Sequence, residues 1–174
     1  MAGNVAGVWV EIDPPHLENT ILAFLKSYWD LKRGARAMPS RSDIRPNEMK
    51  EYLGWILLLD VLPETNDFRF RTVGTRIGEY FLMDATGRTI REAFAPYGEA
   101  AVNSVLATHG KVARERLPIR VHGGAGLFGH AFLDFDAIYL PLSADGQTVN
   151  MILSAFTFDR SALLTARPGD RGPA

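Results

Sequence analysis

The strongest constraint on this chain is a pair of apolar segments, WILLLDVL at 55–62 and FRFRTV at 68–73, joined by PETND. Two short runs of this kind around a turn-forming segment predict a β-hairpin. If Val61 pairs with Phe68, the register is fixed along the whole hairpin. It then joins Leu59 to Phe70 and Leu57 to Thr72, and it places Asp60 opposite Arg69 as a cross-strand charge pair.

The predicted hairpin is apolar on both faces. One face carries the two phenylalanines of 68–73 together with Leu57 and Leu59. The other face carries Asp60, but Ile56 and Leu58 lie there as well. Apolar faces of a sheet have to be covered by another element. We therefore expect either the first helix of the chain or a second subunit to cover the second face.

The segment 14–33 has the pattern of an amphipathic helix. Asp13 can cap it, Pro14 suits its first position, and Gly34 is placed to end it. Its apolar side chains recur at helical spacing, at Leu17, Ile21, Phe24, Leu25 and Tyr28.

A basic connector, KRGARAMPSRSDIRP at 32–46, follows this helix and precedes a short helix at about 46–53. Its positive charges have no interleaved aromatic residue, so a solvated face with structural ion pairs explains them better than a nucleic-acid contact. We expect Arg41 to anchor the connector through a carboxylate or backbone carbonyls, because its planar donor fork suits both.

Helices and then three strands are predicted after the hairpin. Thr75 can cap a helix that runs to Phe81, and a further helix is expected at about 97–114. The β-like stretches LPIRVH, AFLDFDAIYLPL and TVNMILSAFTF follow. This order predicts an α+β fold with a five-stranded antiparallel sheet and helices on one face.

The stretch GEYFLMDATG at 78–87 raises the question of whether Asp84 serves chemistry or shape. A catalytic acid needs a second carboxylate or a nucleophile to work with, and the sequence places none beside it. Asp84 can hydrogen-bond the backbone two residues on, and Gly87 can take a positive φ at no steric cost. We therefore predict that Asp84 is a turn residue.

Several short motifs occur in order between about residues 22 and 156. They are Tyr28-Trp29, Lys32-Arg33-Gly34, Pro39-Ser40-Arg41, Asp43-Ile44, Phe70-Arg71, Gly74-Thr75-Arg76-Ile77, Asp84-Ala85-Thr86-Gly87-Arg88 and Leu140-Pro141-Leu142. With these motifs the chain resembles PAS domains, and in particular a bacterial group with an N-terminal helix and a Pro-Ser-Arg connector. The resemblance implies structural rather than catalytic roles for Arg41, Asp43, Gly74, Thr75, Asp84, Thr86 and Gly87.

The resemblance also implies a function and a domain organisation. It implies a non-catalytic sensor or signalling module that binds a small apolar ligand, a partner protein or both. The expected parts are an N-terminal helix and connector (1–45), a PAS-like domain (46–160) and a C-terminal tail (161–174), whose polar, Pro- and Gly-rich sequence predicts disorder.

Two other functions remain open. One is a pure protein-interaction or dimerisation module with no ligand. The other is a small-molecule enzyme on a cone-shaped α+β fold, which should show titratable groups facing its cavity. The inferred inner strand positions are almost entirely apolar, and this counts against an enzyme.

Aromatic residues and one histidine are the candidate ligand-binding residues. They are Phe70, Phe81, Phe94, Tyr97, His109, Phe132, Tyr139 and Phe156. We expect an apolar pocket between the sheet and the helices of 75–114, with Tyr97 or Tyr139 as its polar handle.

No cofactor is assigned from the sequence. His109 falls near the end of the helix that supplies the iron ligand in heme-binding PAS sensors, but a hydrogen-bonded helix histidine explains it better than heme. The chain has no cysteine, which excludes cysteinyl-flavin photochemistry and zinc sites built on sulfur. Residues 124–129 match G-x-G-x-x-G, but the segment after them is β-like, and a dinucleotide site needs a helix there.

The charge and the N-terminus shape the expected partners. A formal net charge of −1 gives no field that would attract nucleic acid or an anionic membrane, and the sequence shows neither a signal peptide nor a spanning segment. We expect a cytoplasmic protein that forms a homodimer through its N-terminal helices. With no kinase, cyclase or DNA-binding unit in the sequence, its signal is expected to pass to a separate signalling protein.

Overall fold

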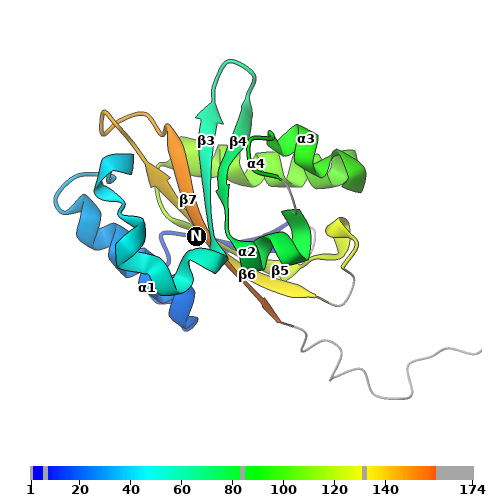
Figure 1. Cartoon of the computed structure of the whole chain (residues 1–174), viewed down its shortest axis with the longest axis horizontal. Helices are drawn as coiled ribbons and strands as arrows, with labels where there is room; N and C mark the ends of the chain where they lie inside the picture. Colours follow the sequence, from blue (N-terminus) through cyan, green and yellow to red (C-terminus); the bar gives the residue numbers. More distant parts are fainter. Residues whose placement is uncertain (1, 6–7, 83–84, 131–132, 160–174) are drawn as a thin grey trace, which may run out of the picture.

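Among the described residues, seven strands form one antiparallel sheet in the order β1-β2-β5-β6-β7-β3-β4. The computed structural model describes residues 2–5, 8–82, 85–130 and 133–159. The strands are β1 (Ala2–Val5), β2 (Val8–Ile12), β3 (Ile56–Leu62), β4 (Asp67–Val73), β5 (Ile119–Gly124), β6 (Asp134–Leu142) and β7 (Met151–Asp159). Figure 1 shows α1 (Thr20–Arg33) to one side of the sheet, and α3 (Ile90–Phe94) and α4 (Glu99–Glu115) to the other.

The sheet has two strands more than the sequence predicted. The five predicted strands are β3 to β7, and all are present. β2 extends the sheet by pairing with β5, and β1 pairs with β2. The signal for β2 is only the short alternation of Val8, Val10 and Ile12, and a pair of strands this short is stable only when joined to a larger sheet.

The predicted domain boundary at residue 45 stays a prediction.

The β3–β4 hairpin keeps the predicted register near its turn and departs from it further away. The observed pairs are Val61–Phe68, Asp60–Arg69, Leu59–Phe70, Leu58–Thr72 and Leu57–Val73. The register shifts between Leu58 and Leu59, so the predicted pairing of Leu57 with Thr72 is wrong. Arg71 is the extra residue of this β-bulge, and a bulge leaves no mark in the alternation of apolar residues.

The bulge also changes the predicted charge pair of the hairpin. Asp60 lies opposite Arg69 as expected, but its ion pair is with Arg71, whose Nε lies 3.0 Å from Asp60 Oδ1. Both side chains are partly exposed, so this pair adds little to the stability of the fold.

Helix α1 begins later than predicted, at Thr20. Asn19 caps it, since its side-chain oxygen accepts hydrogen bonds from the backbone N–H groups of Ile21 (3.0 Å) and Leu22 (3.3 Å). The predicted cap at Asp13 is wrong because β2 continues to Ile12, and the N–H of Asp13 donates to the carbonyl of Pro118 instead. The predicted end is confirmed, because Gly34 has φ of 57° and its N–H donates to the Asp30 carbonyl.

The second apolar face of the hairpin is covered within the chain. Ile56 and Leu58 are both buried, and α1 packs against the neighbouring strands β6 and β7. The Trp29 side chain is also buried, and its Nε1–H donates to the carbonyl of Pro141 on β6 at 2.8 Å. The second face is therefore buried within the chain, on the sheet whose strands β6 and β7 contact α1.

The basic connector is fixed to the domain by tyrosine and backbone contacts. The Tyr28 hydroxyl donates to a carboxylate oxygen of Glu48 and accepts from the backbone N–H of Arg45, each at 2.8 Å. The carbonyl of Pro39 accepts from the N–H of Ser143. These bonds join α1, the connector and the short 3₁₀ segment η2 (Pro46–Trp55) to the end of β6.

Arg41 and Asp43 stabilise the connector locally. Arg41 Nη1 donates to the carbonyl of Ile44 at 2.9 Å, so Arg41 braces the turn η1 (Arg41–Asp43) rather than reaching the sheet. Asp43 accepts from the N–H and the hydroxyl of Ser40 and pairs with Arg36. These contacts, with the Ser40 N–H bond the largest, hold the pKa of Asp43 below its usual value.

Gly74 begins the helical segment on the other side of the sheet. It is the N-cap of α2 (Thr75–Ile77), so the predicted cap at Thr75 is wrong. Position 74 has to be a glycine because two backbone segments approach closely there. A Cβ at position 74 would lie 2.5 Å from the carbonyl oxygen of Gly54. A π-helical turn, η3 (Gly78–Leu82), continues from α2.

The turn after η3 joins this segment back to β4. Gly87 has φ of +86°, and its N–H donates to the carbonyl of Phe70 at 2.7 Å. The N–H of Phe70 in turn donates to the carbonyl of Arg88. Thr86 is exposed in this turn, and Asp84 lies outside the described residues. A left-handed conformation at 87 is the one that the sequence predicted for a glycine.

The contact at Gly74 gives a direct test of the fold. Gly74→Ala should lower the free energy of unfolding by about 1 to 3 kcal/mol, because the added methyl group meets the Gly54 backbone. Gly126→Ala is the matched control, since a Cβ there meets no atom within 4 Å. Urea unfolding of the two variants checks this. Equal stability in the two variants would contradict the close approach.

Candidate functional site

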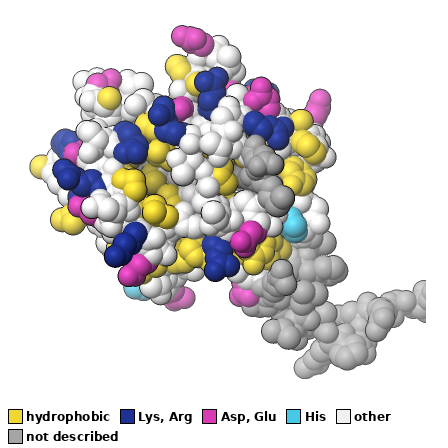
Figure 2. Space-filling model, in the orientation of Figure 1, with side chains coloured by type: hydrophobic (Ala, Val, Ile, Leu, Met, Phe, Trp, Pro, Cys, Tyr) yellow, Lys and Arg dark blue, Asp and Glu magenta, His cyan; other side chains and the backbone are white. Residues whose placement is uncertain are grey.

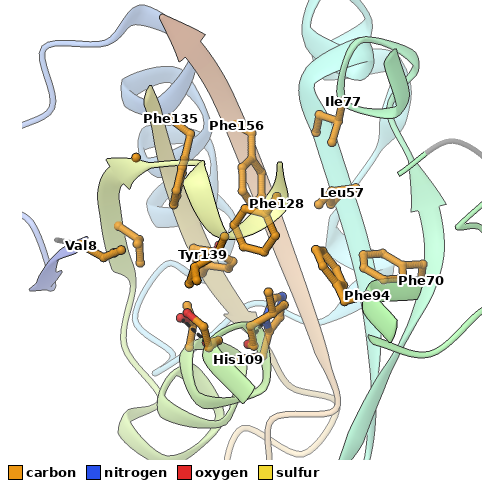
Figure 3. Close-up of a pocket in the computed structure, with 16 residues that line it drawn as sticks. Val8, Leu57, Phe70, Ile77, Phe94, His109, Phe128, Phe135, Tyr139 and Phe156 are labelled. Carbon is orange, nitrogen blue, oxygen red and sulfur yellow. Dashed lines mark hydrogen bonds between the residues drawn. The ribbon is translucent and has the colours of Figure 1, made fainter. Parts of the chain in front are cut away.

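An apolar cavity of about 70 Å³ lies between the sheet and the helices of 75–115. Figure 3 shows side chains from strands, α3, α4 and the loop after β5 converging on it. The lining residues are Val8, Leu57, Phe70, Ile77, Phe94, Ser104, Val105, Thr108, His109, Val121, Gly124, Leu127, Phe128, Phe135, Tyr139 and Phe156. Four of these residues have polar side chains, namely Ser104, Thr108, His109 and Tyr139.

The strands contribute to this cavity through their alternation. The positions of Phe135 and Tyr139 on β6 differ by an even number, so their side chains lie on the same face of the sheet. Phe156 on β7 belongs to this face too, and its ring packs edge-to-face against the ring of Tyr139. Val121 on β5 pairs with Ala137 and completes the row. Regular strand geometry therefore builds one wall of the cavity.

His109 is the most unusual residue of the cavity. Its side chain is almost fully buried, and its ring packs against Phe68 and Tyr139. Its Nδ1 lies 2.8 Å from the carbonyl oxygen of Val105. Because a carbonyl can only accept, Nδ1 carries the proton. The other ring nitrogen, Nε2, has no hydrogen-bond partner among the described residues. Burial lowers the pKa of His109 to about 4, so the ring is neutral at pH 7.

Tyr139 is the second polar group of the cavity wall. It is buried, and burial raises the pKa of its hydroxyl above the ordinary value. The cavity thus combines a largely apolar wall with one buried polar atom, His109 Nε2, that has no hydrogen-bond partner among the described residues.

The predicted ligand-binding residues are placed differently by the structure. Phe70, Phe94, His109, Tyr139 and Phe156 line the cavity. Tyr97 does not line it and packs instead against Phe94 and Phe128. Phe132 and the side chain of Phe81 lie outside what the structure describes.

Sequence reasoning missed about two thirds of the residues that line the cavity. Strand alternation in β5 and β6 could have pointed to Val121 and Phe135. Val8 was missed together with β2. Phe128 stands in the glycine-rich connection, which folds as a single 3₁₀ turn, η5 (Gly126–Phe128). That turn is too short to offer a helix N-terminus to a pyrophosphate, so the G-x-G-x-x-G match builds a cavity wall and no nucleotide site.

The size of the cavity limits what it can hold. Pockets for drug-sized ligands measure about 300 to 1,000 Å³. This cavity is several times smaller, so a porphyrin does not fit beside His109 in the described arrangement. The described residues also contain no group of three or more carboxylate or imidazole side chains that could hold a metal ion.

The positive charges of the connector are largely paired inside the chain. Lys32 Nζ lies 2.7 Å from a carboxylate oxygen of Glu48, and Arg33 pairs with Asp30. Arg36 pairs with Asp43 of the turn η1. Figure 2 shows Lys and Arg side chains on the viewed face interspersed with Asp and Glu. Nucleic-acid binding surfaces usually concentrate basic residues in one stripe or patch.

The fold and the cavity define an α+β class of protein, with helices enclosing an apolar pocket on one face of an antiparallel sheet. The family model described as PAS domain matches residues 17–157. Since this match covers most of the chain, the protein belongs to the PAS domain family, whose members serve as sensor and signalling modules. No helix within the described residues has the length and apolar character needed to cross a bilayer.

Among solved structures, the chain is similar to an RNA-binding light-oxygen-voltage receptor, with a TM-score of 0.47 and 15% sequence identity. The match covers 90% of this chain and 39% of the receptor, so the chain spans well under half of that protein. No curated protein matches the chain significantly in sequence.

The burial of His109 predicts a specific pH dependence of stability. The pKa of His109 is about 4 in the folded protein and rises to its ordinary 6.5 on unfolding, so protons bind the unfolded chain first. His109 therefore contributes full stability above pH 6.5, and this is lost as pH falls toward 4, at a cost of up to about 3 kcal/mol. The nearby Asp67 carboxylate opposes this effect.

His109→Phe should flatten the change in unfolding free energy between pH 7 and pH 4.5, relative to the unsubstituted chain. His16→Gln, at an exposed histidine, is the control and should keep the original slope. Urea unfolding at each pH gives the comparison. The same slope in His109→Phe as in the unsubstituted chain would show that His109 is not buried in its neutral form.

Proposed function

We propose that this PAS domain is a non-catalytic sensor that binds a small, mostly apolar molecule in the cavity between its sheet and α4. The observation that carries the proposal is a cavity whose wall is apolar apart from a few polar side chains. Small-molecule sites commonly have this composition, because buried area supplies affinity and a few polar groups fix orientation. A cavity that served packing alone would lose van der Waals contacts for no gain.

The lining of the cavity supports a route from ligand to output. Ser104, Val105, Thr108 and His109 belong to α4, while Leu57 and Tyr139 belong to strands. A ligand that fills the space between them contacts both layers at once. It favours whichever arrangement of α4 and the sheet fits it best, and so shifts a conformational equilibrium.

The composition of the cavity also supports a binding role over an enzyme. Its titratable side chains are His109 and Tyr139, and neither is hydrogen-bonded to a hydroxyl that could act as a nucleophile. Nucleophilic catalysis needs such a pair. The lowered pKa of His109 has burial as its main cause.

A lining variant and a neighbouring variant test the ligand proposal. Val105 lines the cavity, whereas Val102 on the same helix does not. A library of small apolar molecules should contain compounds that raise the melting temperature by about 3 to 6 °C at ten times their Kd. Val105→Met should abolish this shift by filling the cavity, and Val102→Met should preserve it.

If no compound shifts the unsubstituted chain, or if Val105→Met and Val102→Met respond alike, ligand binding in this cavity is refuted. A protein-interaction module then becomes the better account.

We also propose that the signal passes through protein contacts, with a homodimer as one of them. Two large apolar side chains support this proposal. Leu31 on α1 is 76% exposed and Trp9 on β2 is 52% exposed. Exposed aromatic and aliphatic anchors of this kind are enriched at protein interfaces.

The homodimer proposal predicts the effect of one charge on α1. The unsubstituted chain should sediment as a dimer at tens of micromolar, and Leu31→Glu should shift it toward monomer. Leu117→Glu, at an exposed leucine after α4, should leave the dimer intact. Analytical ultracentrifugation of the three proteins measures their oligomeric states. A monomeric unsubstituted chain would refute the dimer.

A further inference from the structure

His109, which lines the cavity, has one ring nitrogen without a hydrogen-bond partner among the described residues. Its Nδ1–H is committed to the Val105 carbonyl, one helical turn earlier on α4. That bond fixes the tautomer, so the ring cannot turn Nε2 into a donor without losing it. The rings of Phe68 and Tyr139 hold the imidazole from two sides, with centroid distances of 5.2 and 5.1 Å. The lone pair of Nε2 is therefore held in a fixed position.

No group of the described residues satisfies this acceptor. Nε2 is buried and has no partner among the described residues. The hydroxyl of Thr108 is not available in the observed rotamer, because it donates to the carbonyl of Ser104 at 3.1 Å. A buried acceptor without a donor costs free energy, and replacing it by an apolar group of similar shape is often neutral or favourable.

The geometry points to a ligand that supplies the missing donor. We propose, on the basis of the ligand-binding function above, that the cavity takes a small neutral molecule carrying one N–H or O–H group, which donates to Nε2 of His109. The remaining surface of this molecule is apolar and packs against the phenylalanines of the cavity wall.

The surroundings define the ligand class further. A carboxylate or other acceptor would face the Nε2 lone pair and gain nothing. A cation would lose its hydration in a cavity whose wall is largely apolar. An apolar cavity of 150 Å³ in another protein holds benzene, so a space of about 70 Å³ suits a molecule below the size of benzene. Small alcohols and five-membered N–H heterocycles meet all three conditions.

Pyrrole and furan form a matched pair of probes. They have almost the same shape, but pyrrole carries an N–H donor and furan has none. Titration followed by backbone amide chemical shifts should give a Kd for pyrrole roughly tenfold lower than for furan, as expected for one added hydrogen bond. In His109→Phe the two values of Kd should become equal within about twofold. His16→Gln is the control and should retain the tenfold preference.

A second measurement keeps the proposal testable if His109→Phe fills the cavity or fails to fold. In the unsubstituted protein, pyrrole should move the imidazole ¹⁵N resonance of His109 Nε2 while Nδ1 stays near its free value. Furan should move neither.

The outcomes separate the two proposals. If neither probe binds, the proposed ligand-binding function fails, and this inference fails with it. If both bind with equal Kd and Nε2 does not shift, the cavity binds ligands but the donor to His109 is refuted. If the preference for pyrrole persists in His109→Phe, another group accepts the donor and the inference is also refuted.

Discussion

The rest of the structure depends on one constraint, which is that the central strands of the sheet are apolar on both faces. Ile138 and Leu140 on β6 point to one side, and Tyr139 to the other, and all three are buried. A sheet of this kind must be covered twice. Helix α1 meets the first requirement, and the helices of 75–115 meet the second. The N-terminal segment is therefore part of the core, since without it Ile138 and Leu140 would face water.

The two covers differ in how closely they fit, and this difference creates the site. On the α1 side, Trp29 fills the interface and bonds to the Pro141 carbonyl. On the other side, short helical segments and large aromatic rings meet the curved sheet, and a cavity remains beside His109. The buried imidazole with an unbonded nitrogen is destabilising for packing alone. Its position at the cavity links the imperfect fit of this side to a binding role.

Local signals in the sequence predicted the elements, while long-range contacts decided their details. The strands β3 to β7, the helix end at Gly34 and the positive φ of Gly87 follow from alternation and glycine chemistry, so they were predictable. Asn19 replaced Asp13 as the helix cap because β2 extends the sheet, which local propensity cannot show. The shift in the β3–β4 register could not be predicted either, because a β-bulge leaves no mark in the alternation of apolar residues. For the site, Tyr139 and His109 were predicted as ligand-binding residues, and both line the cavity. That Nε2 of His109 has no hydrogen-bond partner among the described residues depends on packing, which only the three-dimensional structure shows.

The central claim is that the cavity beside His109 is a real apolar space that a small molecule can enter. A crystal structure of the protein under xenon pressure tests this most directly, because xenon binds apolar cavities and scatters strongly. The account predicts a xenon site enclosed by Leu57, Phe156 and Val105, with the surrounding side chains unmoved. A crystal structure with those side chains collapsed onto one another and no xenon between them would contradict it.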